Sequence, residues 1–280
     1  MLLEIAVGDA YGAGFEYADA AFVASLNDLS RYVKHPRHAI VPGCYTDDAQ
    51  MSLAIAEAIL SGESWTREML AQKFVGAFKR DPREGYAGRF YDFLVNVRDG
   101  EQFLRDIRPD SDKSGAAMRV VPLGVCVSVE EVLQKCTLQA AITHNTPDGI
   151  NAAVAVSLAA HYFLYDVGEK RDLGLWLERH VAGDWTSQWR GKVKSKGWMS
   201  VRAALTALRE DDSLSAILQR CISFGGDVDT VAAIALGIAS CSREVVNDLP
   251  ENLVVTLENN RFGRDYIVTL DQRLLALVAR

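Results

Sequence analysis

The sequence lacks the features of several large protein classes. No window of about 18 uninterrupted apolar residues occurs, so no membrane-spanning helix is expected. Its 30 basic residues are outnumbered by 37 acidic ones, and the net charge of −7 argues against general nucleic-acid binding, which requires a basic face. Clean alternation of apolar and polar residues, typical of half-buried strands, is scarce.

The cysteines form no motif, and we expect no signal peptide at the start of this sequence. The five cysteines are scattered, odd in number and without CxxC spacing, which argues against a zinc site. Most lie in apolar stretches, so we expect reduced, buried thiols. The start, Met1–Val7, is too short for a signal peptide and carries Glu4 where such a peptide has a basic residue. We therefore expect a protein of a reducing compartment, the cytoplasm.

Helical periodicity dominates what is present. Apolar residues recur at i, i+3, i+4 and i+7 in residues 90–97, 201–208 and 214–221, and an expected C-terminal helix has apolar residues at 267, 270, 274 and 277. Ala152–Leu164 and Val231–Ala239 are apolar on nearly every face, which is typical of central helices. Proline marks two boundaries: Asp81-Pro82 follows a helix from about Thr66 to Lys79, and Thr146-Pro147 begins another.

The chain shows no internal repeat, low-complexity tract or change of composition that would mark a linker. The sequence therefore predicts an all-α fold, one compact multi-helix domain over residues 1–280. No heptad seam is present, so we expect a monomer.

Two short acidic clusters stand at expected helix starts, Tyr45-Thr46-Asp47-Asp48 and Gly226-Asp227-Val228-Asp229-Thr230. One Ser, Thr or Asp suffices as an N-cap, whereas these clusters together hold four aspartates and two threonines. Short carboxylate and hydroxyl side chains suit hard divalent cations, and a carboxylate between two ions can bridge them. The alternative is two capped helices whose dipoles favour acid. Because the clusters form a pair, we favour the metal interpretation.

Five motifs follow one another along the chain: Gly8-Asp9-Ala10-Tyr11-Gly12, Tyr45–Asp48, Ser114–Arg119 with Pro122-Leu123-Gly124, Thr143-His144 and Gly226–Thr230. Together they resemble the ADP-ribosylglycohydrolase family, which includes the glycohydrolase that reactivates dinitrogenase reductase and the mammalian ADP-ribosyl-acceptor hydrolases. The resemblance runs from residue 8 to about residue 240. It implies a compact all-α fold with a binuclear Mg²⁺ or Mn²⁺ centre in a cleft.

The resemblance also implies which side chains bind the metals. Thr46, Asp47 and Asp48 would hold one ion, Asp227 and Thr230 the other, and Asp229 would bridge. The distal ribose would lie over the ions, and water would replace the acceptor at the anomeric carbon. This reaction passes through an oxocarbenium-like transition state, which nearby carboxylates stabilise. Asp9 is expected to hydrogen-bond this region rather than bind metal.

A carboxyl group must also transfer protons. Our candidate is Glu16, in the loop after Gly12 and Gly14, with Asp48 and Asp227 as competitors. The alternative for Glu16 is that it only orients its loop.

The resemblance implies a loop that binds the phosphates and proximal ribose of ADP-ribose, formed by Ser114, Gly115, Ala116, Met118 and Arg119. Successive amides at a helix start favour anions, although a tight turn leading into the core is compatible with this sequence. The family often has Asn where this chain has Ser114, which places one side-chain contact in doubt. His144 would contact a phosphate or the adenosine side, or else hydrogen-bond the backbone at a helix entry.

The segment Gly183–Trp198 combines three tryptophans with Arg and Lys residues. Such a segment suits phosphates and flat rings, but a solvated loop with tryptophans folded beneath it is favoured, because charge runs usually face water.

Three functions compete. The favoured one is metal-dependent removal of ADP-ribose from protein side chains, first from arginine N-glycosides and next from serine-type O-glycosides. A non-catalytic ADP-ribose-binding protein on the same fold is less favoured, because four clustered aspartates repel one another without metal. A two-metal phosphohydrolase ranks last, because the histidine-rich ligand sets common in such sites are missing.

Overall fold

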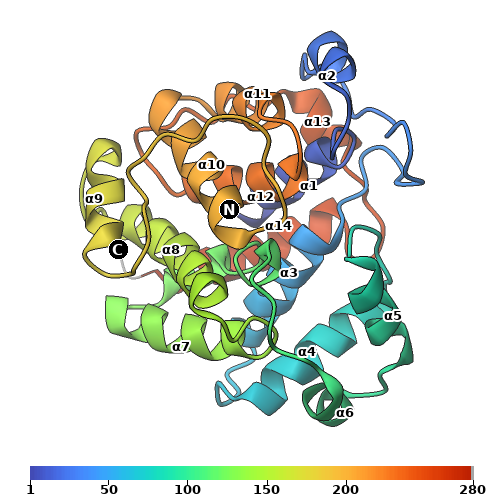
Figure 1. Ribbon diagram of the computed structural model, residues 1–280, viewed down its shortest axis with the longest axis vertical. Helices are drawn as coiled ribbons and strands as arrows, with labels where there is room; N and C mark the ends of the chain where they lie inside the picture. The colour runs from blue at the N-terminus through green and yellow to red at the C-terminus, as the bar shows by residue number, and fades with distance from the viewer. Residues whose placement is uncertain (279–280) are drawn as a thin grey trace.

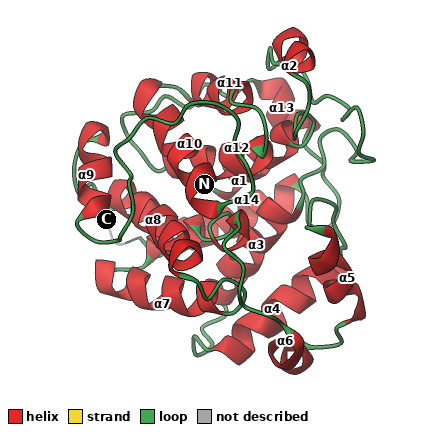
Figure 2. Ribbon diagram, viewed as in Figure 1, coloured by secondary structure: helices red, strands yellow, loops and turns green. Residues whose placement is uncertain are grey.

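The computed structural model describes residues 1–278, and all regular structure within them is helical. In chain order the α-helices are α1 (Leu2–Gly12), α2 (Ala20–Leu26), α3 (Asp47–Leu60), α4 (Arg67–Arg80), α5 (Gly88–Asn96), α6 (Gly100–Asp106), α7 (Val129–Ala141), α8 (Pro147–Leu164), α9 (Leu173–Glu178), α10 (Gly197–Glu210), α11 (Leu214–Ser223), α12 (Val228–Ala239), α13 (Glu251–Thr256) and α14 (Arg264–Leu275). Short 3₁₀ helices are η1 (Ser114–Ala116), η2 (Val121–Val125) and η3 (Lys170–Asp172). Across the described residues, extended segments pair only through isolated bridges, and Figure 2 shows helices joined by loops.

The helices surround a central pair, α1 and α12 (Figure 1). Helix α12 also contacts α3, α8, α10 and α11, and all of its residues from Val228 to Ala239 are buried. Helices α4, α5 and α6 group on one side of the molecule, and α7, α8 and α9 on another. None of the helices in the described residues is long and apolar enough to cross a membrane.

The sequence patterns explain where the helices start. Thr146 accepts a hydrogen bond from the amide of Gly149 (3.1 Å), so it caps α8 as the Thr-Pro pair predicts. Thr66 caps α4 in the same way, through the amide of Met69 (3.2 Å). Helix α3 runs from Asp47 to Leu60, so it begins at the first acidic cluster as expected, and α14 ends at Leu275, before the last apolar residue of the predicted pattern. The predicted all-α class is confirmed.

Glycines on α1 allow the central pair to pack closely. A Cβ atom at Gly8 would lie 2.7 Å from the carbonyl oxygen of Ala232, and one at Gly12 would lie 2.3 Å from the Cα of Asp229. Both obstacles are backbone atoms of α12, which cannot move aside without displacing the helix. These glycines therefore set the distance between α1 and the acidic first turn of α12.

We expect Gly12→Ala to destabilise the protein by about 1–3 kcal/mol, as overpacking of a core does. Gly76, inside α4, is the matched control, because a Cβ there meets no atom within 4 Å. Gly76→Ala should be neutral or slightly stabilising, since alanine is the better helix former. Urea unfolding of both variants measures the difference, and equal stability of the two would show that the contact at Gly12 imposes no constraint.

Candidate metal and substrate site

The two acidic clusters lie at the N-terminal ends of α3 and α12, and both are buried. The six predicted ligands are each no more than 9% exposed: Thr46, Asp47, Asp48, Asp227, Asp229 and Thr230. Six buried oxygen-bearing side chains at two helix starts require compensation, because burial of uncompensated carboxylates is costly.

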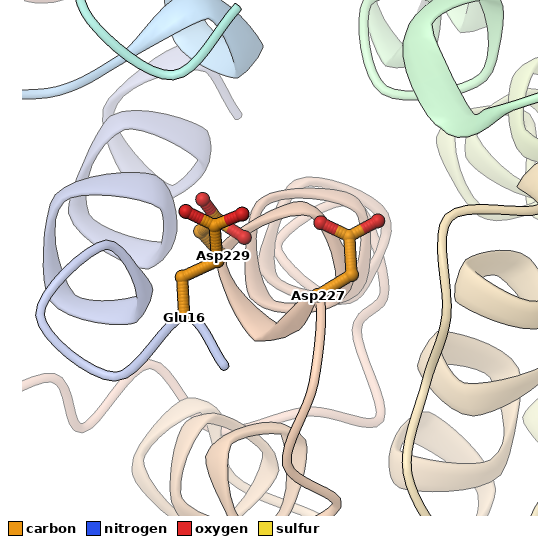
Figure 3. Close-up of side chains that lie close together, drawn as sticks. All are labelled: Glu16, Asp227 and Asp229. Carbon is orange, nitrogen blue, oxygen red and sulfur yellow. The ribbon is translucent and has the colours of Figure 1, made fainter. Parts of the chain in front are cut away.

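Glu16 joins the second cluster. It follows α1 and places a carboxylate oxygen beside those of Asp227 and Asp229, so that one oxygen from each residue lies within 4.8 Å of the others. Figure 3 shows the three carboxyl groups gathered beside the start of α12, with Glu16 and Asp229 adjacent. Glu16 is partly exposed, whereas both aspartates are buried. The structure therefore brings together residues that are far apart in the sequence.

Mutual repulsion and burial raise the pKa values of these carboxyl groups. The charge of Asp229, together with burial, raises the pKa of Glu16 to about 9. Burial, then the charge of Asp229, raises the pKa of Asp227 to about 8, and burial raises that of Asp229 itself. The cluster thus favours whatever supplies positive charge, either protons or cations.

Asp47 and Asp48 lie outside this tight group of three but face the same region. Burial is the main cause that raises the pKa of each, and the charges of Asp229 and Asp227 raise both further. The loop before α5 closes over Asp47: Gly85 adopts a φ of +100°, and a Cβ there would lie 2.2 Å from the Oδ1 of Asp47.

Asp9 organises the first cluster from α1. Its carboxylate accepts hydrogen bonds from the amides of Thr46 (2.9 Å) and Ala49 (2.8 Å) and from the hydroxyl of Thr46 (2.7 Å). Asp9 therefore caps α3 from another helix. Because the Thr46 hydroxyl donates its proton to Asp9, the lone pairs of its oxygen remain available for a cation. Asp9 thus has the hydrogen-bonding role that the sequence predicts.

The geometry disfavours the alternative that these residues only cap helices. Thr46 and Asp227 occupy the N-cap positions of α3 and α12, yet neither side chain makes a capping hydrogen bond. Within the described residues, the buried Oδ1 atoms of Asp48 and Asp229 have no hydrogen-bond partner. Such buried acceptor oxygens fit divalent-cation ligands, because a cation supplies the interaction they otherwise lack.

The η1 loop forms the edge of the cluster. The hydroxyl of Ser114 lies 3.4 Å from the Oδ2 of Asp227, to which it donates a hydrogen bond. Gly115 faces the ring of His144, since a Cβ there would lie 3.3 Å from its Nε2. Ala116 and Met118 are buried beneath the loop, so their side chains support it from within the core.

Arg119 points into the protein. Only 2% exposed, its guanidinium donates hydrogen bonds to Gln139 (2.7 Å) and to the hydroxyl of Thr143 (3.0 Å), and it lies over the ring of Phe74. The sequence predicts contact of Arg119 with substrate; the structure instead links it to the site indirectly, through Thr143 and His144.

A short chain of hydrogen bonds orients His144. The Thr143 hydroxyl lies 2.7 Å from the Nδ1 of His144, and its oxygen accepts a hydrogen bond from Arg119. Donation from the hydroxyl to Nδ1 gives each group a partner, so the proton of the neutral ring is placed on Nε2, facing Gly115. Burial lowers the pKa of His144 to about 3, which keeps the ring neutral.

The segment Gly183–Trp198 connects the two sides of the site through its backbone. Val193 donates to the carbonyl of Gly225 (2.9 Å) and accepts from the amide of Asp227 (3.1 Å), while Ser195 accepts from the amide of Ser114 (3.1 Å). Trp185 is buried and Lys192 is exposed. The favoured prediction, a solvated loop with tryptophans beneath it, agrees with the positions of these side chains. The backbone of the segment also hydrogen-bonds the loop before α12 and the η1 loop.

His35, which no pattern in the sequence singles out, is buried and lies beside Glu16. It occurs in no motif, and its neighbours Lys34 and Pro36 carry no signal of a role. A separate surface cavity of about 290 Å³, lined by residues including Lys170, Trp185 and Arg209, contains none of the predicted site residues.

Known proteins that are similar to this chain are named as hydrolases of ADP-ribosyl groups. Mouse ADP-ribosylhydrolase ARH3 is 30% identical over 176 residues, covering 58% of this chain and 47% of that protein. ADP-ribosylarginine hydrolase Tri1 of Serratia proteamaculans is 23% identical and covers 85% of this chain and 69% of its own length. The ADP-ribosyl-[dinitrogen reductase] glycohydrolase of Rhodospirillum rubrum is 24% identical, covering 91% and 88%.

A solved structure described as an ADP-ribosylglycohydrolase-related protein complex has the same fold, with a TM-score of 0.76 and 21% identity over 99% of this chain and 96% of that one. The match to ARH3 proteins spans about half of their length. A family model for ADP-ribosylglycohydrolase matches residues 1–280. The chain therefore belongs to the ADP-ribosylglycohydrolase family.

Proposed function

We propose that this protein uses two divalent cations, Mg²⁺ or Mn²⁺, to hydrolyse the glycosidic bond between ADP-ribose and an arginine side chain. The observation that carries the proposal is that Asp48 and Asp229, one from each acidic cluster, both bury a carboxylate oxygen that has no hydrogen-bond partner in the described residues. We favour arginine as the acceptor because a relative that covers most of this chain is named an ADP-ribosylarginine hydrolase.

The six buried oxygen donors divide between the two helix starts. Thr46, Asp47 and Asp48 of α3 would hold one ion, Asp227 and Thr230 of α12 the other, and Asp229 would bridge them. Bound cations supply positive charge that orients ribose hydroxyls and water and lowers the pKa of that water. The carboxylates also stabilise positive charge that develops on the ribose ring in the transition state.

Glu16 is the proton-transfer group of this proposal. It is the only partly exposed member of the group of three carboxylates, so its carboxyl can exchange protons with water and with a leaving group. Without bound cations, the negative charge of Asp229 is the largest cause that raises the pKa of Glu16. Asp48 and Asp227 are buried, which suits ligands better than proton carriers.

The η1 loop and His144 are proposed to bind the phosphates. None of the hydrogen bonds among the described residues uses the amides of Gly115 or Ala116, so both are free to donate. The Nε2–H of His144 faces the same loop. These neutral donors suit phosphate oxygens without adding a charge.

We expect Thr143→Val to weaken ADP-ribose binding by about fivefold to tenfold, the cost of roughly one hydrogen bond. Valine preserves the shape but removes the group that orients His144. Thr137→Val, at an exposed position of α7, the helix that ends shortly before Thr143, is the control and should bind as the wild type does. Calorimetry measures both, and an unchanged Kd in Thr143→Val would exclude a role for this chain of hydrogen bonds.

Release of ADP-ribose from proteins modified on arginine and, separately, on serine tests the proposed function. Each reaction is run with Mg²⁺, with Mn²⁺ and with EDTA. Metal-dependent release from the arginine linkage supports the proposal. Release from serine alone would show that the substrate is a serine-type O-glycoside. Tight ADP-ribose binding without release from either would favour the non-catalytic binding protein.

A further inference from the structure

Glu16 depends on its loop for its position, because it lies beyond the end of α1. The residue that follows, Tyr17, has a φ of +49°, in the left-handed region that non-glycine residues rarely adopt. A conformation of this kind persists only where the surrounding structure imposes it. The contacts that hold residues 16 and 17 therefore determine where the carboxylate lies.

His35 makes the contact to Glu16 itself. Its Nε2 lies 2.7 Å from the backbone carbonyl oxygen of Glu16. Its Nδ1 accepts hydrogen bonds from the amides of Arg37 (3.0 Å) and His38 (2.8 Å). Backbone amides can only donate, so Nδ1 carries no proton, and the proton of the neutral ring is on Nε2. The ring therefore donates to Glu16.

Two further contacts hold the same turn. The amide of Tyr17 donates to the carbonyl of Gly226 (2.8 Å), and the guanidinium of Arg37 donates to the carbonyl of Tyr17 (2.6 Å). Glu16 and Tyr17 are thus held between His35-Pro36-Arg37 and the turn that precedes Asp227. The His35 side of this arrangement is buried, since the residue is only 2% exposed.

We propose that His35 is a positioning residue, which donates a hydrogen bond from Nε2 to the Glu16 backbone and so holds the Glu16 carboxylate beside Asp227 and Asp229. The inference rests on the proposed function for its effect on hydrolysis, but its effect on the loop is independent of that function. It assigns a role to a histidine whose hydrogen bond to Glu16 is made with the backbone carbonyl and not with the carboxylate.

Two substitutions separate the two sides of the ring. The amide oxygen of His35→Asn can replace Nδ1 and accept from Arg37 and His38, but this side chain cannot reach Glu16. The amide nitrogen of His35→Gln can replace Nε2 and donate to Glu16. We expect His35→Asn to lower kcat by about 100-fold with little change in KM, the effect of a misplaced catalytic group. His35→Gln should recover most of this loss.

Two readouts distinguish positioning from general damage. In a Glu16→Gln background, His35→Asn should cause no further loss of kcat, because it acts through Glu16. Hydrogen exchange at the Tyr17 amide should accelerate by roughly tenfold or more in His35→Asn and remain near the wild-type rate in His35→Gln. His180→Asn, an exposed histidine that also contacts a backbone carbonyl, is the control and should change neither readout.

The proposal is overturned if His35→Asn retains Tyr17 protection, or if it lowers kcat equally with and without Glu16. Absence of hydrolysis by the wild type would refute the proposed function instead, and the exchange of Tyr17 would still decide the role of His35.

Discussion

Asp229→Asn is expected to lower metal-dependent kcat by at least about 1,000-fold, comparable with the loss of an electrostatic group that stabilises a transition state. Asp229 lies in the first turn of α12, adjoins Glu16 and Asp227, and has a buried oxygen without a hydrogen-bond partner in the described residues. Asparagine has the same shape but no negative charge, so it would remove the proposed bridge between the two cations. Steady-state kinetics with saturating Mn²⁺ measures the loss.

The same substitution should not destabilise the metal-free protein, because it removes one charge from a group of carboxylates that repel each other. Thermal unfolding in EDTA therefore separates lost chemistry from lost folding. Asp148→Asn is the matched control, since Asp148 is an exposed residue in the first turn of α8. Activity of Asp229→Asn within about tenfold of the wild type would contradict a bridging role.

The metal-free protein is expected to lose stability as the pH rises from about 6 to about 8.5. Over this pH range its Tm should fall by about 5 °C or more beyond any change in the Tm of the Mn²⁺-bound protein. The pKa values of Asp9, Asp227 and Glu16 are raised to about 7, 8 and 9. In the unfolded state, carboxyl groups have pKa values of about 4. Between this value and the raised pKa values of the folded state, the folded protein binds more protons than the unfolded chain. Folding stability must then decrease with increasing pH.

The proposed cations would replace the lost protons, so Mn²⁺ should raise Tm more at the higher pH than at the lower. Calorimetric scans with EDTA and with saturating Mn²⁺ at both pH values measure this difference. A Tm increment from Mn²⁺ that is independent of pH would indicate that the cations bind away from the carboxylate cluster.

The helical fold could be predicted from the sequence because the patterns that indicate helices depend on residues close together in the chain. The Thr-Pro pair at Thr146 and the apolar faces of α8 and α12 depend on neighbouring residues, and these elements formed as predicted. The six candidate ligands also come from two short runs, which the structure places at two buried helix starts. Whether they bind metal stays a prediction.

Side-chain direction could not be predicted, because it depends on contacts between distant segments. Arg119 stands in a loop motif, yet its guanidinium turns inward because Gln139 and Thr143 supply buried acceptors. Thr46 looks like an ordinary N-cap, but Asp9 of another helix takes the capping role. His35 reaches Glu16 from a segment without a motif.

Anomalous diffraction from crystals grown with Mn²⁺ tests the metal centre most directly. We expect two peaks, one beside Asp47 and Asp48 and one beside Asp227, with Asp229 in contact with both. Mn²⁺ peaks elsewhere, or none at a saturating concentration, would contradict the assignment of these buried carboxylates as metal ligands.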